Sequence, residues 1–221
     1  MSKLAQELIF FFNKIPKVTS TQRITIKEEQ DGAVLKELNI DSTHYQLENL
    51  PKESLCEDLW KNKRTHDCNC DGVILITDPT NNSQLLLIEL KSKLEEEQFT
   101  KALTQIIISL LKIHTHFSLC ASYEDLLRLP VKVIICGSDT MAWSDWIERK
   151  SIKQNGKLNK LDSLYRSLLG GNIKSIPLKD VLKKASWAQG WCIPQNLLDI
   201  KLEIQILCSE GSPILPHTLD L

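Results

Sequence analysis

The sequence has 221 residues and a formal net charge of −1, with 42% hydrophobic and 25% charged residues. This length and balance are typical of one globular domain with insertions or a small appendage, and they indicate a core that is stable without disulfides. No apolar stretch approaches the roughly 20 residues that span a bilayer, and no secretory signal is visible. The seven cysteines show no framework spacing, so we expect a reducing, cytoplasmic environment.

The first third of the sequence predicts a helix followed by two strands. Apolar residues at helical spacing indicate a helix over Lys3–Lys14. Alternating polar and apolar residues predict a strand over Val18–Glu28, and the turn signal Asp31-Gly32 precedes a second strand over 33–38. Residues 41–67 are polar, and we treat residues 31–67 as an insertion.

The middle of the sequence predicts a β-hairpin and a long helix. The apolar runs Val73–Ile76 and Leu85–Lys91 flank the turn-forming residues Asp78–Ser83, so we expect two antiparallel strands. A helix over Glu95–Phe117 follows, with glutamates in its first turn, where the positive end of the helix dipole favours them. Its broad apolar arc predicts that it is covered on more than one side.

The last part of the sequence predicts shorter elements and a basic region. We expect helices over Tyr123–Leu129 and Leu158–Leu169, strands over Val131–Cys136, Ile173–Ile176 and Ile200–Leu207, and a loose tail from Ser212. Residues 141–184 hold ten Lys or Arg residues against four acids, a local net charge of +6. Such a region either grips a phosphate backbone or forms an ordinary solvated face.

Two acidic residues and a lysine carry the strongest chemical signal. Side chains alternate across a strand, so Glu89 and Lys91 share one face while Ile88 and Leu90 point to the other. Asp71 opens the neighbouring strand, which can bring its carboxylate beside that of Glu89. Paired carboxylates repel each other unless a cation lies between them, and oxygen ligands suit Mg²⁺ or Mn²⁺. The lysine can orient an attacking water, lower its pKa or offset charge in the transition state, as phosphodiester hydrolysis requires.

These residues resemble a known family signature. Cys70-Asp71-Gly72-Val73-Ile74-Leu75-Ile76 and then Ile88-Glu89-Leu90-Lys91, with Glu89 18 residues after Asp71, resemble the D…(D/E)-x-K signature of the PD-(D/E)xK nuclease superfamily. That superfamily includes restriction endonucleases, DNA-repair nucleases and anti-phage effectors. The resemblance covers about residues 70–136 and implies metal ligation by Asp71 and Glu89, with Lys91 as the catalytic lysine. It also implies an α/β fold with a restriction-endonuclease-like αβββαβ core, a central mixed sheet flanked by helices, and C-terminal additions.

The resemblance extends to one further residue and leaves another open. Several branches carry a glutamine on the helix after the E-x-K strand, and Gln105 occupies that place within a polar flank of the long helix formed by Gln98, Lys101, Ser109 and Lys112. Ser109 stands where a Q-x-x-x-Y branch has tyrosine, which counts against that branch. Many members also have a metal-ligating glutamate on the first helix, and Glu7, Glu53 and Glu57 are the candidates here.

Other signals favour ordinary structural roles. Cys56, His66, Cys68 and Cys70 could form a zinc site, but their spacing fits free or buried thiols better. His114 and His116 lie two residues apart on a helix and do not face one ligand. Trp143, Trp146, Trp187 and Trp191 flank the basic region, where core packing competes with base stacking. The sequence has no phosphate-binding G-x-x-x-x-G-K loop and no G-x-S-x-G elbow.

The leading hypothesis is a Mg²⁺- or Mn²⁺-dependent DNA endonuclease in which Asp71 and Glu89 hold the metal, Lys91 assists the water and Gln105 tunes the site. Residues 1–140 would form the nuclease core, and residues 141–221 a basic extension packed on it. The alternatives are an inactive nuclease-like binding or assembly module and a nuclease that cleaves RNA. A homodimer, a partner subunit and a role in restriction or phage defence follow from the resemblance alone, and no membrane contact is expected.

Overall fold

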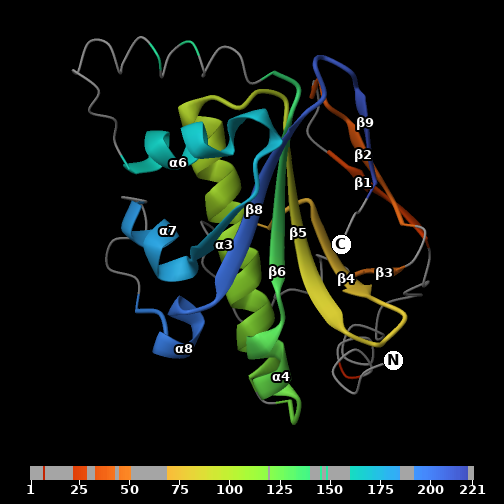
Figure 1. Cartoon of the computed structure of the whole chain (residues 1–221), viewed down its shortest axis with the longest axis vertical. Coiled ribbons are helices and arrows are strands. Elements are labelled where there is room, and N and C mark those ends of the chain that lie inside the picture. The colour runs from red at the N-terminus through yellow and green to blue at the C-terminus, as the bar shows by residue number, and fades with distance from the viewer. Residues whose placement is uncertain are drawn as a thin grey trace.

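The computed structural model describes residues 7, 22–28, 33–42, 45–50, 69–118, 120–139, 145, 148, 160–184 and 192–218. These residues form a mixed α/β structure with two mixed sheets (Figure 1). The larger sheet has six strands in the order β3-β4-β5-β6-β8-β7. Its strands are β3 (Gln46–Asn49), β4 (Gly72–Thr77), β5 (Ser83–Lys91), β6 (Val131–Gly137), β8 (Lys201–Cys208) and β7 (Lys174–Pro177).

The predicted hairpin is confirmed at the centre of this sheet. β4 and β5 pair antiparallel from Gly72 opposite Ile88 to Thr77 opposite Ser83. β5, β6 and β8 then run parallel in register, with Lys91, Gly137 and Cys208 side by side at their carboxyl ends. Strands buried on both faces read as continuous apolar runs, which explains why β4 and β6 lack alternation in the sequence.

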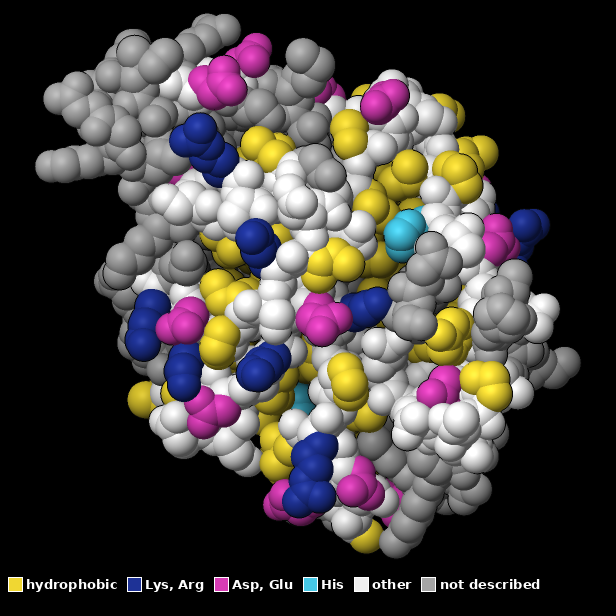
Figure 2. Space-filling view, viewed as in Figure 1, with side chains coloured by type: hydrophobic (Ala, Val, Ile, Leu, Met, Phe, Trp, Pro, Cys, Tyr) yellow, Lys and Arg dark blue, Asp and Glu magenta, His cyan; other side chains and the backbone are white. Residues whose placement is uncertain are grey.

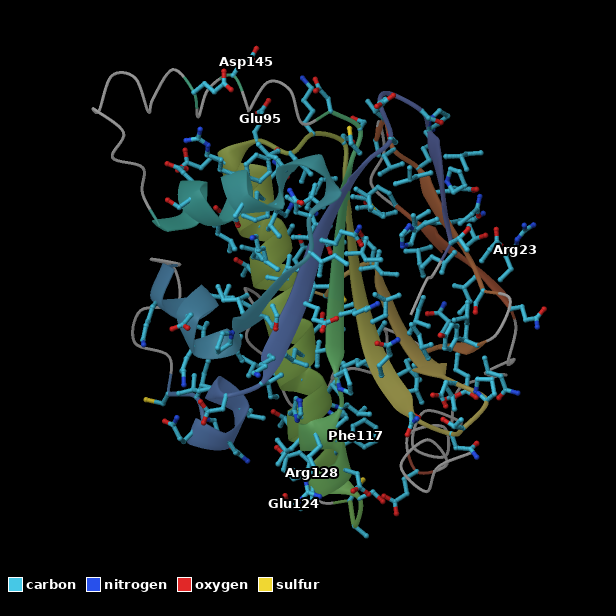
Figure 3. All side chains as sticks on the ribbon, viewed as in Figure 1. Arg23, Glu95, Phe117, Glu124, Arg128 and Asp145 are labelled. Carbon is cyan, nitrogen blue, oxygen red and sulfur yellow. The ribbon has the colours of Figure 1, made fainter. Side chains whose placement is uncertain are left out.

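The long helix α3 (Glu96–Phe117) covers one face of the larger sheet (Figure 1). Its apolar arc packs against the odd-numbered residues of β5 and β6, among them Leu85, Leu87 and Val133. The shorter α6 (Lys160–Leu168) and α7 (Leu178–Lys184) add Tyr165 and Val181 to the same core. The sheet thus covers α3 on one side, and Tyr165 of α6 contacts Phe99 on another. This confirms the prediction that the long helix is covered on more than one side. Figure 3 places Glu95 and Phe117 at opposite ends of α3.

The opposite face of the larger sheet carries the smaller sheet, whose order is β1-β2-β9. Its strands are β1 (Arg23–Lys27), β2 (Glu37–Asp41) and β9 (Ile214–Thr218). Ile24 and Ile26 of β1 pack against Ile74 and Ile88 in a second core. The outer face is polar, and on it Arg23 (labelled in Figure 3) pairs with Asp41. Residues between the two sheets are therefore buried from both sides.

Several expectations about the elements need correction or fall outside the described residues. The tail beyond Ser212 is not loose, because β9 pairs in parallel with β2. Residues 31–67 are more than an insertion, since they supply β2 and β3, and the C-terminal third supplies β7, β8 and β9 to the two sheets. Of the first helix only Glu7 is described, as helical.

The remaining described elements are short. They are α4 (Tyr123–Arg128), the 3₁₀ helix η2 (Leu169–Gly171) and α8 (Gln195–Leu198). Within the described ranges, no helix has the length and apolar character needed to cross a membrane.

Candidate active site at the ends of β4 and β5

Glu89 and Lys91 lie on the α3 side of β5, near its carboxyl end. Strand alternation places both on one face, and the structure buries them, with 0% of Glu89 and 7% of Lys91 exposed. The Lys91 ammonium donates a hydrogen bond to Glu89 Oε1 and another to Gln105 Oε1 of α3, at 3.1 Å. The predicted contact between the E-x-K strand and the helix glutamine is therefore present.

Asp71 directly precedes β4 and meets the same end of β5. Its backbone amide donates to Glu89 Oε2 at 3.2 Å, and its own Oδ2 accepts from the backbone amide of Leu90 at 2.6 Å. Asp71 is half-buried, whereas Glu89 is enclosed. Asp71, Glu89, Lys91 and Gln105, the four residues expected to act together, thus form one connected group.

The electrostatics of this group are dominated by burial. The pKa of Glu89 is raised to about 8, first because the carboxyl is removed from water and second because the charge of Asp71 lies nearby. The Lys91 ammonium opposes this rise but does not cancel it. A cation placed beside both carboxylates would lower the cost of ionising Glu89.

This donor set fits a hard divalent cation with few protein ligands. Mg²⁺ usually keeps several waters and binds through one or two carboxylates together with substrate phosphates. Asp71 and Glu89 provide two such carboxylates, and no group of three or more His, Cys, Asp or Glu residues able to hold a metal exists among the described residues. The site therefore suits Mg²⁺ or Mn²⁺ better than zinc.

The first-helix glutamate expected near the metal is not Glu7. Its Oε2 accepts a hydrogen bond from the backbone amide of Ser122, beyond the C-terminal end of α3. Gln105 lies 12 residues before the last residue of that helix, which is about 18 Å along its axis. Glu7 is thus remote from the site, and Glu53 and Glu57 lie outside the described residues.

Glu28 is an acid near the site that the sequence did not single out. It follows β1, and its charge contributes to the raised pKa of Glu89. Ile26, two residues earlier, packs closely on Gly72, because a Cβ there would lie 2.7 Å from Ile26 Cδ1. The alternation of β1 turns residues 24 and 26 toward the larger sheet, and Glu28 follows the strand half-buried. That alternation is visible in the sequence, but the packing of β1 over Gly72 is not.

The other candidate ligands do not join this site. Burial is the main cause that raises the pKa of the Cys70 thiol to about 12, which disfavours the thiolate that binds zinc. Cys56, His66 and Cys68, the remaining members of that set, lie outside the described residues. His114 is buried against Tyr123 with ring centroids 5.9 Å apart, and His116 Nδ1 lies 3.2 Å from the Lys112 carbonyl. Their contacts fit the structural roles expected.

Two lysines in the described part of the basic region pair with acids. Lys179 pairs with Asp199 at 2.7 Å and Lys183 with Asp180 at 3.6 Å. Figure 2 shows dark blue and magenta side chains interspersed on the side that carries α7 and α8. Lys179 and Lys183 therefore do not add to a continuous phosphate-binding surface. The four tryptophans that flank the region lie outside the described residues.

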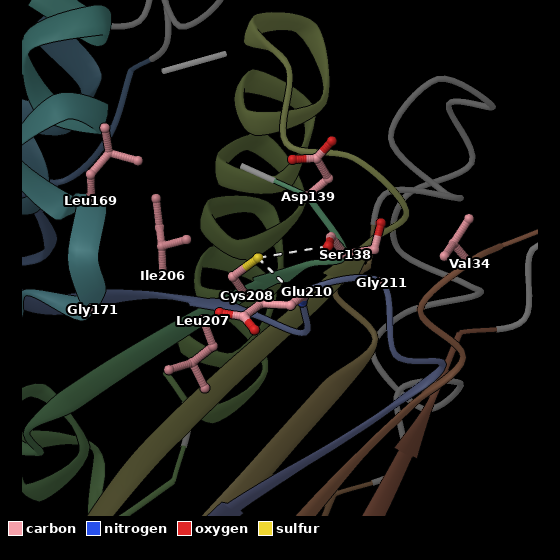
Figure 4. Close-up of a pocket in the computed structure, with 10 residues that line it drawn as sticks. All are labelled: Val34, Ser138, Asp139, Leu169, Gly171, Ile206, Leu207, Cys208, Glu210 and Gly211. Atoms are coloured by element: carbon pink, nitrogen blue, oxygen red, sulfur yellow. Dashed lines mark hydrogen bonds between the residues drawn. The ribbon is translucent and has the colours of Figure 1, made fainter. Parts of the chain in front are cut away.

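A pocket of about 870 Å³ lies at the carboxyl ends of β6 and β8, beside the end of β5 (Figure 4). Ser138, in its lining, donates a hydrogen bond to the carbonyl of Ser92, the residue after Lys91. The lining includes the carboxylates of Asp139 and Glu210. Acidic side chains in the lining do not favour the binding of phosphate there.

Comparisons with known proteins identify no relative of this chain. No protein-family model matches the chain. No curated protein and no solved structure matches it either. The assignment of the site therefore depends on the residues and contacts described above.

Proposed function

We propose that the chain is a divalent-metal-dependent nuclease that hydrolyses phosphodiester bonds, with DNA as its substrate. The observation that carries this proposal is the convergence of Asp71, Glu89 and Lys91 at one end of a strand pair, with Gln105 bonded to Lys91. The order β3-β4-β5-α3-β6 supports a restriction-endonuclease-like αβββαβ core in which β3, not the earlier β1, is the first strand.

Each residue has a distinct part in the proposed reaction. Asp71 and Glu89 hold Mg²⁺ or Mn²⁺, which when bound supplies a Lewis acid to the phosphate. Lys91 is fixed between Glu89 and Gln105, so its ammonium is oriented before substrate arrives. There it stabilises negative charge on a non-bridging phosphate oxygen. Hydrolysis adds the hydroxyl of one water to phosphorus and its proton to the leaving ester oxygen.

A second candidate is a binding or assembly module that keeps this geometry without cutting. One observation favours it: Lys91 and Glu89 already bond each other and are nearly inaccessible to solvent. In such a module the pair would serve stability alone. Substrate cleavage distinguishes the two candidates directly.

The test is a cleavage assay with supercoiled plasmid, single-stranded DNA and tRNA in Mg²⁺ or Mn²⁺. The nuclease proposal predicts cleavage that EDTA stops and that Glu89→Gln and Lys91→Met abolish. Glu97→Gln is the matched control for Glu89→Gln, and Lys93→Met for Lys91→Met. Glu97 and Lys93 are exposed, and each substitution removes the same charge outside the site. Equal cleavage by Lys91→Met and Lys93→Met would reject the proposed mechanism.

The same assay decides among the remaining alternatives. Cleavage of tRNA with intact plasmid would assign the activity to RNA. No cleavage by the wild-type chain, combined with saturable binding of any of the three nucleic acids, would favour the binding module. A homodimer, a partner subunit and a role in restriction or phage defence stay proposals that a cleavage assay does not address.

A further inference from the structure

One stripe of α3 holds the segment that leads into Asp71. Lys112 Nζ donates to the side-chain oxygen of Asn69 at 2.7 Å, and Gln105 Nε2 donates to the Asn69 carbonyl at 3.0 Å. Ser109 Oγ accepts from the backbone amide of Cys70 at 2.8 Å. Residues 105, 109 and 112 are spaced by four and three, so they share one helix face. They fix two consecutive residues immediately before Asp71.

Lys112 is the unexpected member of this group. A lysine on a helix usually extends its ammonium into water, but only 1% of Lys112 is exposed. Burying an ammonium is costly unless hydrogen bonds compensate it. The bond from a charged donor to Asn69 is stronger than one between neutral groups. The helix thus uses a charged side chain, at some cost, to fix one residue of the chain.

Lys112 does not touch the reacting groups, but a chain of hydrogen bonds connects it to them. Lys112 holds the Asn69 side chain, and Gln105 bridges the Asn69 carbonyl to the Lys91 ammonium. Lys91 in turn bonds Glu89, whose other oxygen accepts from the Asp71 amide. Displacing Asn69 would therefore disturb both ends of the site.

We propose that Lys112 is a positioning residue that, through Asn69, fixes the Asp71 and Glu89 carboxylates in the arrangement that binds a divalent cation. The inference rests on the proposed function for its catalytic consequence, although the positioning itself is independent of catalysis. Groups that orient metal ligands from the outer shell affect metal affinity by about 10- to 100-fold when removed. Lys112 acts one step further out, because it bonds Asn69, two residues before Asp71, and not Asp71 itself.

The sign of the effect separates positioning from simple electrostatics. Lys112 is cationic, so removing its charge should strengthen the binding of a metal cation if charge repulsion were its only influence. Positioning predicts the opposite result. A weaker metal affinity after loss of the ammonium is therefore not explained by Coulomb repulsion between Lys112 and the metal.

The experiment compares Lys112→Met with Lys101→Met, which removes a positive charge from an exposed position of the same helix. Mn²⁺ affinity is measured by calorimetry, and amide hydrogen exchange is followed by NMR at Leu90, whose amide donates to Asp71. We expect Lys112→Met to weaken Mn²⁺ binding about tenfold or more. We also expect exchange at Leu90 to accelerate relative to amides within β6, with Lys101→Met unchanged in both measurements.

Asn69→Ala keeps the inference testable if Lys112→Met does not fold. Asn69 is only half-buried, and its alanine variant removes the acceptor of the Lys112 bond. It should weaken Mn²⁺ binding by a similar factor. The losses in the double variant should be less than additive, because the two single variants share the Lys112–Asn69 bond.

The outcomes for the inference and for the proposed function differ. Mn²⁺ binding and Leu90 exchange at wild-type levels in both single variants would overturn the positioning role of Lys112. A wild-type chain that binds no Mn²⁺ would overturn the metal-dependent function, and Leu90 exchange would then decide the positioning role alone. Faster exchange at Leu90 in that case would support positioning, and unchanged exchange would overturn it.

Discussion

The carboxylate of Asp71 accepts a hydrogen bond from the backbone amide of Leu90, the residue between Glu89 and Lys91. The hydrogen bond fixes the Asp71 side chain, at the start of β4, to the backbone of β5. This bond lies just beyond the last ladder pair of β4 and β5, which joins Gly72 and Ile88. One side chain therefore continues the hairpin ladder and also supplies a candidate metal ligand.

Asp71→Asn should separate these two roles. An amide oxygen can still accept from Leu90, so the β4–β5 hairpin should persist, but a neutral ligand binds a divalent cation more weakly. We expect cleavage to fall by at least about 100-fold, while circular dichroism and the thermal midpoint remain close to those of the wild type. Asp71→Ala removes the acceptor as well and should lower the thermal midpoint. Wild-type cleavage by Asp71→Asn would exclude Asp71 as a ligand.

Metal binding should depend on pH through Glu89. Its pKa is raised to about 8, so the carboxyl is mostly protonated at pH 6, and a metal must displace that proton. Each pH unit below 8 reduces the ionised fraction about tenfold. Mn²⁺ affinity, measured by calorimetry, should thus rise about tenfold from pH 6 to pH 7, less steeply from pH 7 to pH 8, and level off above. Glu89→Gln should remove this slope, and a wild-type affinity that is flat over the range would contradict the assignment.

Local patterns in the sequence are sufficient to predict the hairpin, the long helix and the proximity of the candidate residues on them. The contacts among Asp71, Glu89 and Lys91 follow from strand alternation and from pairing between neighbouring segments. The placement of Gln105 follows from helical periodicity. These residues are close in the sequence. Over such short separations, the alternation of side chains and the turn residues restrict the chain to few conformations.

Non-local pairing explains most of what the sequence did not predict. β9 contains proline and histidine and reads as a tail, yet it pairs in parallel with β2, far earlier in the chain. The segment of β1 reads as a strand, but the sequence does not show that it packs on the main sheet from the other side. No sequence pattern identifies Asn69, because its role depends on its contacts with α3, a helix that lies later in the chain. Alternation specifies which face of a strand is buried and does not specify its neighbours.

Gly137 provides a test of the packing at the end of β6. A Cβ there would lie 2.5 Å from Leu94 Cγ and 2.8 Å from Leu94 Cδ1, in the segment between β5 and α3. Gly137→Ala should therefore destabilise the chain by about 1–3 kcal/mol, the usual cost of overpacking. Urea denaturation measures this change. Adding Leu94→Ala should make the glycine substitution less costly, whereas additive losses would show that the two residues do not share this space.

The pH dependence of stability should report on His114. The residue is 2% exposed, its Nδ1 has no hydrogen-bond partner among the described residues, and burial lowers its pKa to about 4. In the unfolded chain its pKa is about 6.5, so between pH 6.5 and pH 4 the unfolded state binds more protons than the folded state. The contribution of His114 to the free energy of unfolding should therefore fall as pH decreases through this range, by up to about 1.4 kcal/mol per unit. Glu89, whose pKa is raised to about 8, contributes in the opposite direction between about pH 4.5 and pH 8, so the two contributions have to be separated.

His114→Leu isolates this contribution from the titration of acidic groups. Leucine keeps the site apolar and does not titrate, so the stability difference between variant and wild type should widen in favour of the variant from pH 7 to pH 4.5. Urea denaturation at four pH values gives the difference directly. His116→Leu is the control, because His116 is only half-buried and lies two positions away on the same helix. A difference for His114→Leu that does not change with pH would mean that the pKa of His114 is the same in the folded and unfolded chain, which would contradict the effect of burial.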